Sequence, residues 1–568
     1  MSPIAVRRTG VRLPGLQQQA LSVARQRLAA GILLFLGLVL LVGLRLLDLG
    51  ALSDGELSRP VRGAGMMPPR ADIVDRNGVP LASTYEAFGL AARPADLTRD
   101  RTELVRRLSE IFPDRDVAAI ASALNHSGRF RYIARRIRPD QAQRVRELGE
   151  PGLTLEREPD RLYPNLSLAA HLIGTTTIDG AGSAGIERAF DTRLTDPDRR
   201  DQPLVLSMDA RVQQALESEL AAEMERQQAE GAAGVVMDVD TGEVLAMASL
   251  PAYNLNQPGG LPGMPEYINR ATLGVYELGS TFKPFTVAMA LEAGVVPSLA
   301  TKYAVSGLRV GRHTITDVHR RGGPFTVPEV VIYSSNVATA RMAEQMGRQK
   351  QEMFLRRLGM MERAPGEILE KGRTLTPPTN NWGLASVLTV GFGHGIAVTP
   401  LHLANAYATL VNGGIHRPAT FLKVPRGQQV PGERVFSEEV SRLSNGMLRL
   451  AVTEGTGRRA DAPGYRVGGK TGTAEKPRPG GGYYKNRNIA TFAGAFPMDA
   501  PRYVIVIMID DPRGAKETGF SRGAGAVAAP VFRNVVHRIA PVLDVLPDDT
   551  KDMDLSAFTG LYTPRRAR

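Results

Sequence analysis

A serine and a lysine near the middle of this chain could form an acylating pair. Ser280 and Lys283 belong to the stretch Glu277-Leu-Gly-Ser-Thr-Phe-Lys-Pro-Phe285, and the apolar residues around Pro284 predict that a helix begins here. Side chains three apart in a helical turn share one face. A serine at a helix start exposes its hydroxyl, and a neighbouring lysine can act as its base. The pattern alone is common, so its meaning depends on the rest of the chain.

Two further short motifs follow downstream. Ser334-Ser-Asn336 comes after an apolar run, and Lys470-Thr-Gly-Thr473 comes after Val467-Gly-Gly469. The three patterns Ser-x-x-Lys, Ser-x-Asn and Lys-Thr-Gly each occur once, in this order, on an expected helix, an expected helical insert and an expected strand. The glycines around Lys470 would let a ligand approach an exposed strand edge closely. Together, the three motifs indicate a serine acyl-transfer site.

With these motifs, nearly all of the chain after residue 50 resembles the class B penicillin-binding proteins, which are D,D-transpeptidases that cross-link peptidoglycan. The resemblance extends to an N-terminal pedestal, through Arg70–Ala82, Arg161-Leu-Tyr-Pro164 and Gly185-Ile-Glu187. The stretch Gly391-Phe-Gly-His-Gly-Ile-Ala-Val-Thr-Pro400 is similar to the septal, FtsI-type branch. No segment of glycosyltransferase size separates the pedestal from the apolar N-terminal run, which argues against class A.

The resemblance implies a role for each motif residue. Ser280 would attack the penultimate D-Ala carbonyl of a donor stem peptide, and Lys283 would be its base if burial and the nearby Lys470 hold it neutral. Ser334 would relay a proton to the leaving amine, while Asn336 would hold the substrate amide and orient Lys283. The remaining implied roles are substrate binding by Lys470, Thr471, Gly472 and Thr473, and an oxyanion hole formed by the backbone N–H groups of Ser280 and Thr473.

Composition and charge narrow the alternatives. The chain has no cysteine and eight histidines without zinc-binding spacing, so we predict no catalytic metal and no cofactor. The net charge of +12 comes from scattered arginines without an aromatic-basic module, which favours a solvated surface over nucleic-acid binding. The expected partners are stem peptides, β-lactams, the membrane and divisome proteins, including a lipid II glycosyltransferase of the FtsW type.

The N-terminus predicts a membrane anchor. Residues 1–27 contain five arginines and no acidic residue, and the apolar residues of 28–49 are long enough to span a bilayer if Arg45 snorkels. The positive-inside rule places residues 1–27 in the cytoplasm and the chain after about residue 50 in the periplasm. We therefore expect an uncleaved, single-pass protein of the inner membrane, located at the division septum.

The fold is expected to be α/β with several domains. Residues 50–206 would form an α+β pedestal, in which 101–147 have a charged, helical pattern, and residues 207–546 would form the transpeptidase domain. In that domain, strands near 234–248, 468–473, 489–496 and 503–510 predict a central antiparallel sheet that both ends of the domain complete, with a helical insert beside it. The resemblance implies that helices flank this sheet as in serine β-lactamases. Residues 547–568 read as a polar, loose tail.

Other readings of the sequence are weaker. Gly464–Thr471 fits the P-loop pattern, but Gly472, Pro477 and Pro479 forbid the helix that must follow. Gly519-Phe-Ser-Arg-Gly523 matches a nucleophile elbow without a strand leading into Ser521, and Gly180–Gly185 matches a dinucleotide fingerprint without a βαβ unit. We expect His394 in a loop beside the site, His402 on a helix surface and Trp382 in packing. As functions, an elongation-type transpeptidase and a non-catalytic β-lactam sensor or division scaffold stay open.

Overall fold

The computed structural model describes residues 30–33, 35–37, 39–40, 70–257, 259, 263–318, 321–378 and 382–564. Within these ranges, no helix is both long enough and apolar enough to cross a membrane. The expected cytoplasmic arm and most of the expected anchor at 28–49 lie outside the described residues.

The first described region is an α+β module of two small sheets, with strand orders β6-β2-β1-β7 and β4-β3-β5. Its elements are β1 (Ile73–Val74), β2 (Pro80–Tyr85), β3 (Phe88–Ala92), α2 (Arg101–Ile111), α3 (Val117–Leu124), β4 (Arg131–Ile137), α4 (Pro139–Glu147), β5 (Leu153–Arg157), β6 (Asp160–Leu162), α5 (Ala170–Ile173), α6 (Gly185–Ala189), α7 (Asp191–Thr195) and β7 (Leu204–Val205). Apolar residues from α2, α3, α4 and the sheet of β3 form one core. Asn77 and Gly78 make the expected turn between β1 and β2.

The helical pattern expected over residues 101–147 is wrong for one segment of this range. Residues 131–137 form β4, which pairs antiparallel with the fully buried β3. Pairing with a buried strand outweighs the local preference of an arginine-rich segment, because strand propensity depends strongly on the neighbours against which a segment packs.

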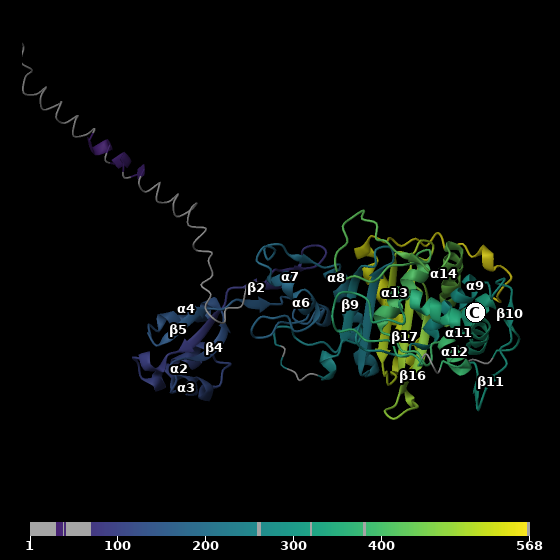
Figure 1. The fold of residues 1–568 in the computed structure, drawn as a ribbon, viewed down its shortest axis with the longest axis horizontal. Helices are drawn as coiled ribbons and strands as arrows, with labels where there is room; N and C mark the ends of the chain where they lie inside the picture. Colours follow the sequence, from purple (N-terminus) through teal and green to yellow (C-terminus); the bar gives the residue numbers. More distant parts are fainter. Residues whose placement is uncertain are drawn as a thin grey trace, which may run out of the picture. The chain divides into compact units, whose positions relative to one another are not determined.

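The second region is organised around a five-stranded antiparallel sheet (Figure 1). Its strands, in spatial order, are β16 (Gly468–Pro477), β17 (Tyr483–Phe496), β18 (Tyr503–Asp510), β8 (Gly231–Asp238) and β9 (Val244–Leu250). Strands from both ends of the domain therefore complete one sheet, which confirms the predicted antiparallel topology. β16 lies at one edge of the sheet, so one side of the Lys470 strand has no strand neighbour among the described residues.

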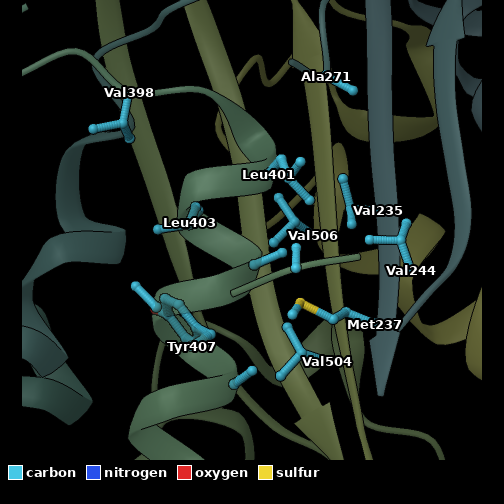
Figure 2. Packing of buried hydrophobic residues seen from close by; sticks show 14 of the residues in the cluster. Val235, Met237, Val244, Ala271, Val398, Leu401, Leu403, Tyr407, Val504 and Val506 are labelled. Carbon is cyan, nitrogen blue, oxygen red and sulfur yellow. The ribbon is translucent and has the colours of Figure 1, made fainter. Parts of the chain in front are cut away.

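Helices cover both faces of this sheet. On one face, α8 (Ala210–Gln227) and α15 (Ala528–Ile539) share a core with the sheet. Gly234 of β8 allows α8 to come close, because a Cβ there would lie 2.7 Å from a Leu216 methyl carbon. The other face packs on α13 (Pro400–Val411), all of whose residues are buried. Figure 2 shows Leu401 of this helix directed toward Val506 of the sheet.

Among its described residues, the helical insert contains five further α-helices and a small hairpin. They are α9 (Lys283–Glu292), β11 (Leu308–Val310), β12 (His313–Ile315), α10 (Val327–Tyr333), α11 (Asn336–Arg357), α12 (Leu384–Gly391) and α14 (Glu438–Thr453). α9, α10, α11 and α14 contribute to one apolar cluster beside the sheet. The Ser-x-x-Lys and Ser-x-Asn motifs lie at the ends of these helices, next to β16.

The C-terminal tail is packed, which contradicts our expectation that it is loose. Phe558 is 1% exposed and belongs to the same apolar cluster as α10. Its ring lies over Gly446 of α14, where a Cβ would be 2.2 Å from the ring. Asp552 also accepts a hydrogen bond from the buried Arg449 at 2.7 Å. A buried aromatic residue and the ion pair with Arg449 therefore help to hold this largely polar segment.

Candidate active site

Ser280 lies in a turn of 3₁₀-helix, η5 (Gly279–Phe282), that leads directly into α9 at Lys283. In 3₁₀ geometry, residues three apart are eclipsed, so Ser280 and Lys283 share a side of the turn as the sequence predicted. Gly279 has a φ of +53°, and its N–H donates to the carbonyl of Gly393 at 3.2 Å. The buried Tyr407 donates its hydroxyl to the carbonyl of Thr281 at 2.9 Å, which fixes the turn to the core helix α13.

Lys283 is completely buried and reaches toward the second motif. Its Nζ donates to the Ser334 hydroxyl at 3.0 Å and to the Ser334 carbonyl at 2.5 Å. Burial and the positive charge of Lys470 lower the pKa of Lys283 well below its usual value, while Asp317 acts in the opposite direction. A buried lysine with a lowered pKa can accept a proton near neutral pH.

The second motif joins two helices. Ser334 ends α10 in the left-handed conformation, with φ 61° and ψ 47°, and Asn336 is the first residue of α11. The side-chain amide of Asn336 donates to the carbonyl of Thr316 at 3.1 Å. In this structure, the hydrogen bonds of Lys283 go to Ser334, so Ser334 takes the orienting position that the resemblance implied for Asn336.

The third motif forms one face of the site on β16. Lys470 is buried, and its Nζ donates to the carbonyl of Thr471 at 3.2 Å and to the hydroxyl of Thr456 at 3.4 Å. Burial lowers the pKa of Lys470 to about 7. Thr473 is exposed, and its hydroxyl accepts a hydrogen bond from the N–H of Ala524 at 3.1 Å.

Gly472 brings β16 and the Ser280 turn into direct contact. A Cβ on Gly472 would lie 2.2 Å from the carbonyl oxygen of Leu278 and 2.8 Å from a carbon of Thr281. A Cβ on Gly279 would likewise lie 2.9 Å from the carbonyl of Thr473. Real Cβ atoms do not come so close to backbone atoms, so only glycine at both positions permits this approach. The structure thus brings all three motifs together.

Several residues near the site were missed or misplaced by the sequence analysis. The hydroxyl of Thr456 contacts the Thr471 hydroxyl at 2.7 Å. Thr456 follows α14 in a Gly-Thr-Gly stretch, and these glycines were the only local indication of a functional residue. Asp317 had no signal in its neighbourhood. His402, expected on a helix surface, is instead buried and caps its own helix through its Nδ1, 2.9 Å from the Thr399 hydroxyl.

His394 lies in a loop beside the site and pairs with Glu277, three residues before Ser280. Its Nδ1 is 3.0 Å from the Glu277 carboxylate, and this contact raises the pKa of His394. The same carboxylate accepts a hydrogen bond from the hydroxyl of Tyr483 at 2.8 Å. Glu277 therefore joins the loop of His394 to the β16–β17 hairpin at one end of the site.

The competing motifs do not form their expected structures. The P-loop-like stretch runs into β16 at Gly468, where a P-loop requires a helix. Ser521 lies in an exposed loop before α15, with no strand leading into it. Within the part of the chain that the structure describes, no group of three or more histidine or acidic side chains is placed to hold a metal ion.

Comparison with known proteins assigns the class. A family model described as the penicillin-binding protein transpeptidase domain matches residues 232–537, and one described as the penicillin-binding protein dimerisation domain matches residues 66–202. The chain belongs to the penicillin-binding proteins, among the peptidoglycan D,D-transpeptidases.

Two curated relatives indicate the branch. A probable peptidoglycan D,D-transpeptidase FtsI of Caulobacter vibrioides is 39% identical over 525 residues, covering 90% of this chain and 87% of the relative. The peptidoglycan D,D-transpeptidase FtsI of Escherichia coli K12 is 34% identical over 537 residues, covering 89% of each. Among solved structures, penicillin-binding protein 3 of Mycobacterium tuberculosis complexed with aztreonam matches with a TM-score of 0.66 and 26% identity, over 85% of this chain and 98% of that chain.

Proposed function

We propose that this protein cross-links peptidoglycan during septal wall synthesis through an acyl-enzyme on Ser280. The observation that carries the proposal is the buried Lys283, whose lowered pKa and hydrogen bonds to Ser334 join the first two motifs beside the strand of the third. Two FtsI proteins that align over most of the chain, and a related structure that holds a β-lactam, support the same reading.

The acylation step uses groups that the structure brings together. The Oγ of Ser280 attacks the carbonyl carbon of the penultimate D-Ala, and its proton passes to the neutral Lys283. The backbone N–H groups of Ser280 and Thr473 stabilise the oxyanion. When the C–N bond breaks, the proton moves through Ser334 to the departing D-Ala amine, and an acyl ester remains on Ser280.

Substrate binding falls to β16 and Asn336. Lys470 and the hydroxyls of Thr471 and Thr473 receive the terminal carboxylate of the donor, which favours the charged form of Lys470, and Gly472 leaves room for the peptide along the strand edge. Asn336 donates to the substrate amide. An amine of a second stem peptide then attacks the ester and forms the cross-link. A β-lactam acylates the same serine and is trapped there.

The cellular setting is also part of the proposal. Residues 28–49 anchor the protein in the inner membrane, with residues 1–27 in the cytoplasm and both the pedestal (50–206) and the transpeptidase domain (207–546) in the periplasm. At the septum, the protein works with division proteins, including a lipid II glycosyltransferase of the FtsW type. An elongation-type enzyme and a non-catalytic sensor or scaffold are the competing functions.

Labelling with a fluorescent penicillin tests the nucleophile. The wild type should form a covalent adduct, and Ser280→Ala should form none, while Ser521→Ala, a matched serine outside the site, should label like the wild type. Equal labelling of Ser280→Ala and wild type would refute the assignment. Cross-linking of lipid II chains by the wild type separates an enzyme from a sensor, and localisation at the septum or at the lateral wall separates the two branches.

A further inference from the structure

Asp317 lies in a loop outside the three motifs, yet it contacts the second motif directly. One carboxylate oxygen accepts a hydrogen bond from the Ser335 hydroxyl at 2.7 Å, and the other accepts one from the N–H of Val337 at 3.0 Å. These two donors lie on the two sides of Asn336 in the chain. A carboxylate that accepts two hydrogen bonds fixes its donors more firmly than a neutral acceptor would.

Two neighbours of Asp317 in the same loop extend the contact. The carbonyl of Thr316 accepts the hydrogen bond from the Asn336 amide at 3.1 Å, and the Arg321 guanidinium lies 4.0 Å from the centre of the Tyr333 ring. We call Thr316, Asp317 and Arg321 the clamp. Its contacts reach Tyr333, immediately before Ser334, and the three residues that follow Ser334, namely Ser335, Asn336 and Val337.

The conformation of Ser334 explains why this position needs support. Its φ of 61° is a left-handed conformation, which is unfavourable for a non-glycine residue and persists only where the surroundings hold it. Both hydrogen bonds of Lys283 end on this residue. A relaxed Ser334 would therefore move the carbonyl and hydroxyl that orient Lys283.

Packing alone does not set the position of the clamp. Thr316 is exposed and Asp317 half-buried, and a cavity of about 690 Å³ is lined by residues that include Thr316, Asp317 and Arg321. The contacts that hold these residues against the motif are the hydrogen bonds of Thr316 and Asp317 and the ring contact of Arg321.

We propose that Asp317 is a positioning residue for acylation, which acts by holding Ser334 and Asn336 in register with Lys283. This inference rests on the proposed function. The charge of Asp317 has a second consequence, because the charged groups that act on Lys283 are Lys470 on β16 and Asp317. Lys470 favours the neutral form of Lys283, and Asp317 opposes it. Loss of the carboxylate therefore extends the neutral form to lower pH.

Acylation kinetics of full-length protein with a fluorescent penicillin test the proposal. Asp317→Asn, which keeps the shape but loses one acceptor and the charge, should lower the second-order rate constant about tenfold, and Asp317→Ala about a hundredfold. In both variants, the acid limb of the pH–rate profile should shift to lower pH. A merely structural residue would lower the rate without moving that limb.

Glu329→Gln provides the matched control. Glu329 is an acid that caps the start of α10 through Thr326, so its loss weakens the helix of Ser334 without removing a hydrogen bond of Asp317 or Thr316. Wild-type kinetics in Asp317→Ala, an unmoved acid limb, or a rate loss equal to that of Glu329→Gln at the same Tm would each overturn the proposal. Ser280→Ala, measured in parallel, separates the two hypotheses: if it fails to label while Asp317→Ala labels normally, the proposed function stands and this inference falls.

Discussion

The third motif is held by regular structure, whereas the second is held by contacts from a distant loop. Lys470 to Thr473 lie in the ladder between β16 and β17, opposite Ala493 to Ala490, and the ladder fixes the direction of their backbone. Ser334 lies between two helices in a left-handed conformation, and hydrogen bonds from the loop of Asp317 fix the residues beside it. A strand can thus present catalytic groups by its own geometry, while a helix junction needs support from elsewhere.

The largest effect is expected from removal of Lys283, the side chain that links the second motif to the third. Lys283 donates to Ser334 and is also close enough to Lys470 for the two charges to interact. Lys283→Ala should lower the rate of acylation by a fluorescent penicillin about 10²- to 10⁴-fold, the usual contribution of a general base. Thermal unfolding should show that the variant stays folded.

Lys485→Ala is the control, because Lys485 is an exposed lysine on β17. This variant should be acylated at the wild-type rate. Acylation of Lys283→Ala within a few-fold of the wild-type rate would show that another group takes the proton of Ser280.

Adding a methyl group to Gly472 of β16 should lower both stability and the rate of acylation. In Gly472→Ala, the new Cβ would meet the backbone carbonyl of Leu278, which cannot move without shifting the turn of Ser280. Overpacking of this kind costs about 1–3 kcal/mol in the free energy of unfolding. Displacement of the turn should lower acylation roughly a hundredfold. Penicillin labelling and thermal unfolding of the same sample measure both effects.

Gly383→Ala is the matched change, since nothing lies within 4 Å of a Cβ at that position. If Gly472→Ala acylates as fast as Gly383→Ala, the close approach of β16 to the turn is not needed for catalysis.

The difference between the two regions also explains what could be predicted from the sequence. Lys470 and Thr473 were found because they belong to one contiguous motif, which glycines flank on an expected strand. The role of Asp317 could not be found, because the contact depends on how a loop folds back over residues 18 and 20 positions later in the chain. Local patterns identify reactive groups, but the groups that position them come from long-range packing.

The same limit applies to the fold. The single antiparallel sheet followed from the apolar strands expected at both ends of the domain. The tail was misjudged because one aromatic residue, Phe558, decides its packing, and nothing in a polar stretch shows which groove it will fill. β4 was misjudged because its partner, β3, and not its own arginine-rich composition, makes it a strand.

The helix junction at Ser334 should depend on the C-terminal tail for its stability more than for the rate of acylation. Phe558 packs in the cluster that contains α10, the helix that ends at Ser334. Phe558→Ala should lower the free energy of unfolding by about 3 kcal/mol, as expected when a buried phenyl ring is removed. Acylation of the folded fraction should change little, because Asp317 keeps its contacts. Denaturant unfolding and penicillin labelling give the two values.

Leu546→Ala, at a leucine that is 78% exposed, should leave both values unchanged. A large loss of acylation in Phe558→Ala without a loss of stability would show that the tail, and not only the clamp, positions Ser334.

The smallest expected effect concerns Lys470, whose side chain is buried on β16. Burial lowers the pKa of Lys470 to about 7, whereas an unfolded lysine titrates near about 10.4. The unfolded chain binds more protons between these values, so the contribution of Lys470 to the free energy of unfolding rises with pH from about 7 to about 10. Lys470→Met should therefore raise Tm by a few degrees at pH 7 and flatten the rise of Tm with pH, although it removes the carboxylate-binding group. Calorimetry from pH 7 to pH 9.5 measures the change of Tm with pH, with Lys485→Met as the exposed control. A Tm profile of Lys470→Met parallel to that of the wild type would mean that β16 buries Lys470 without an electrostatic cost.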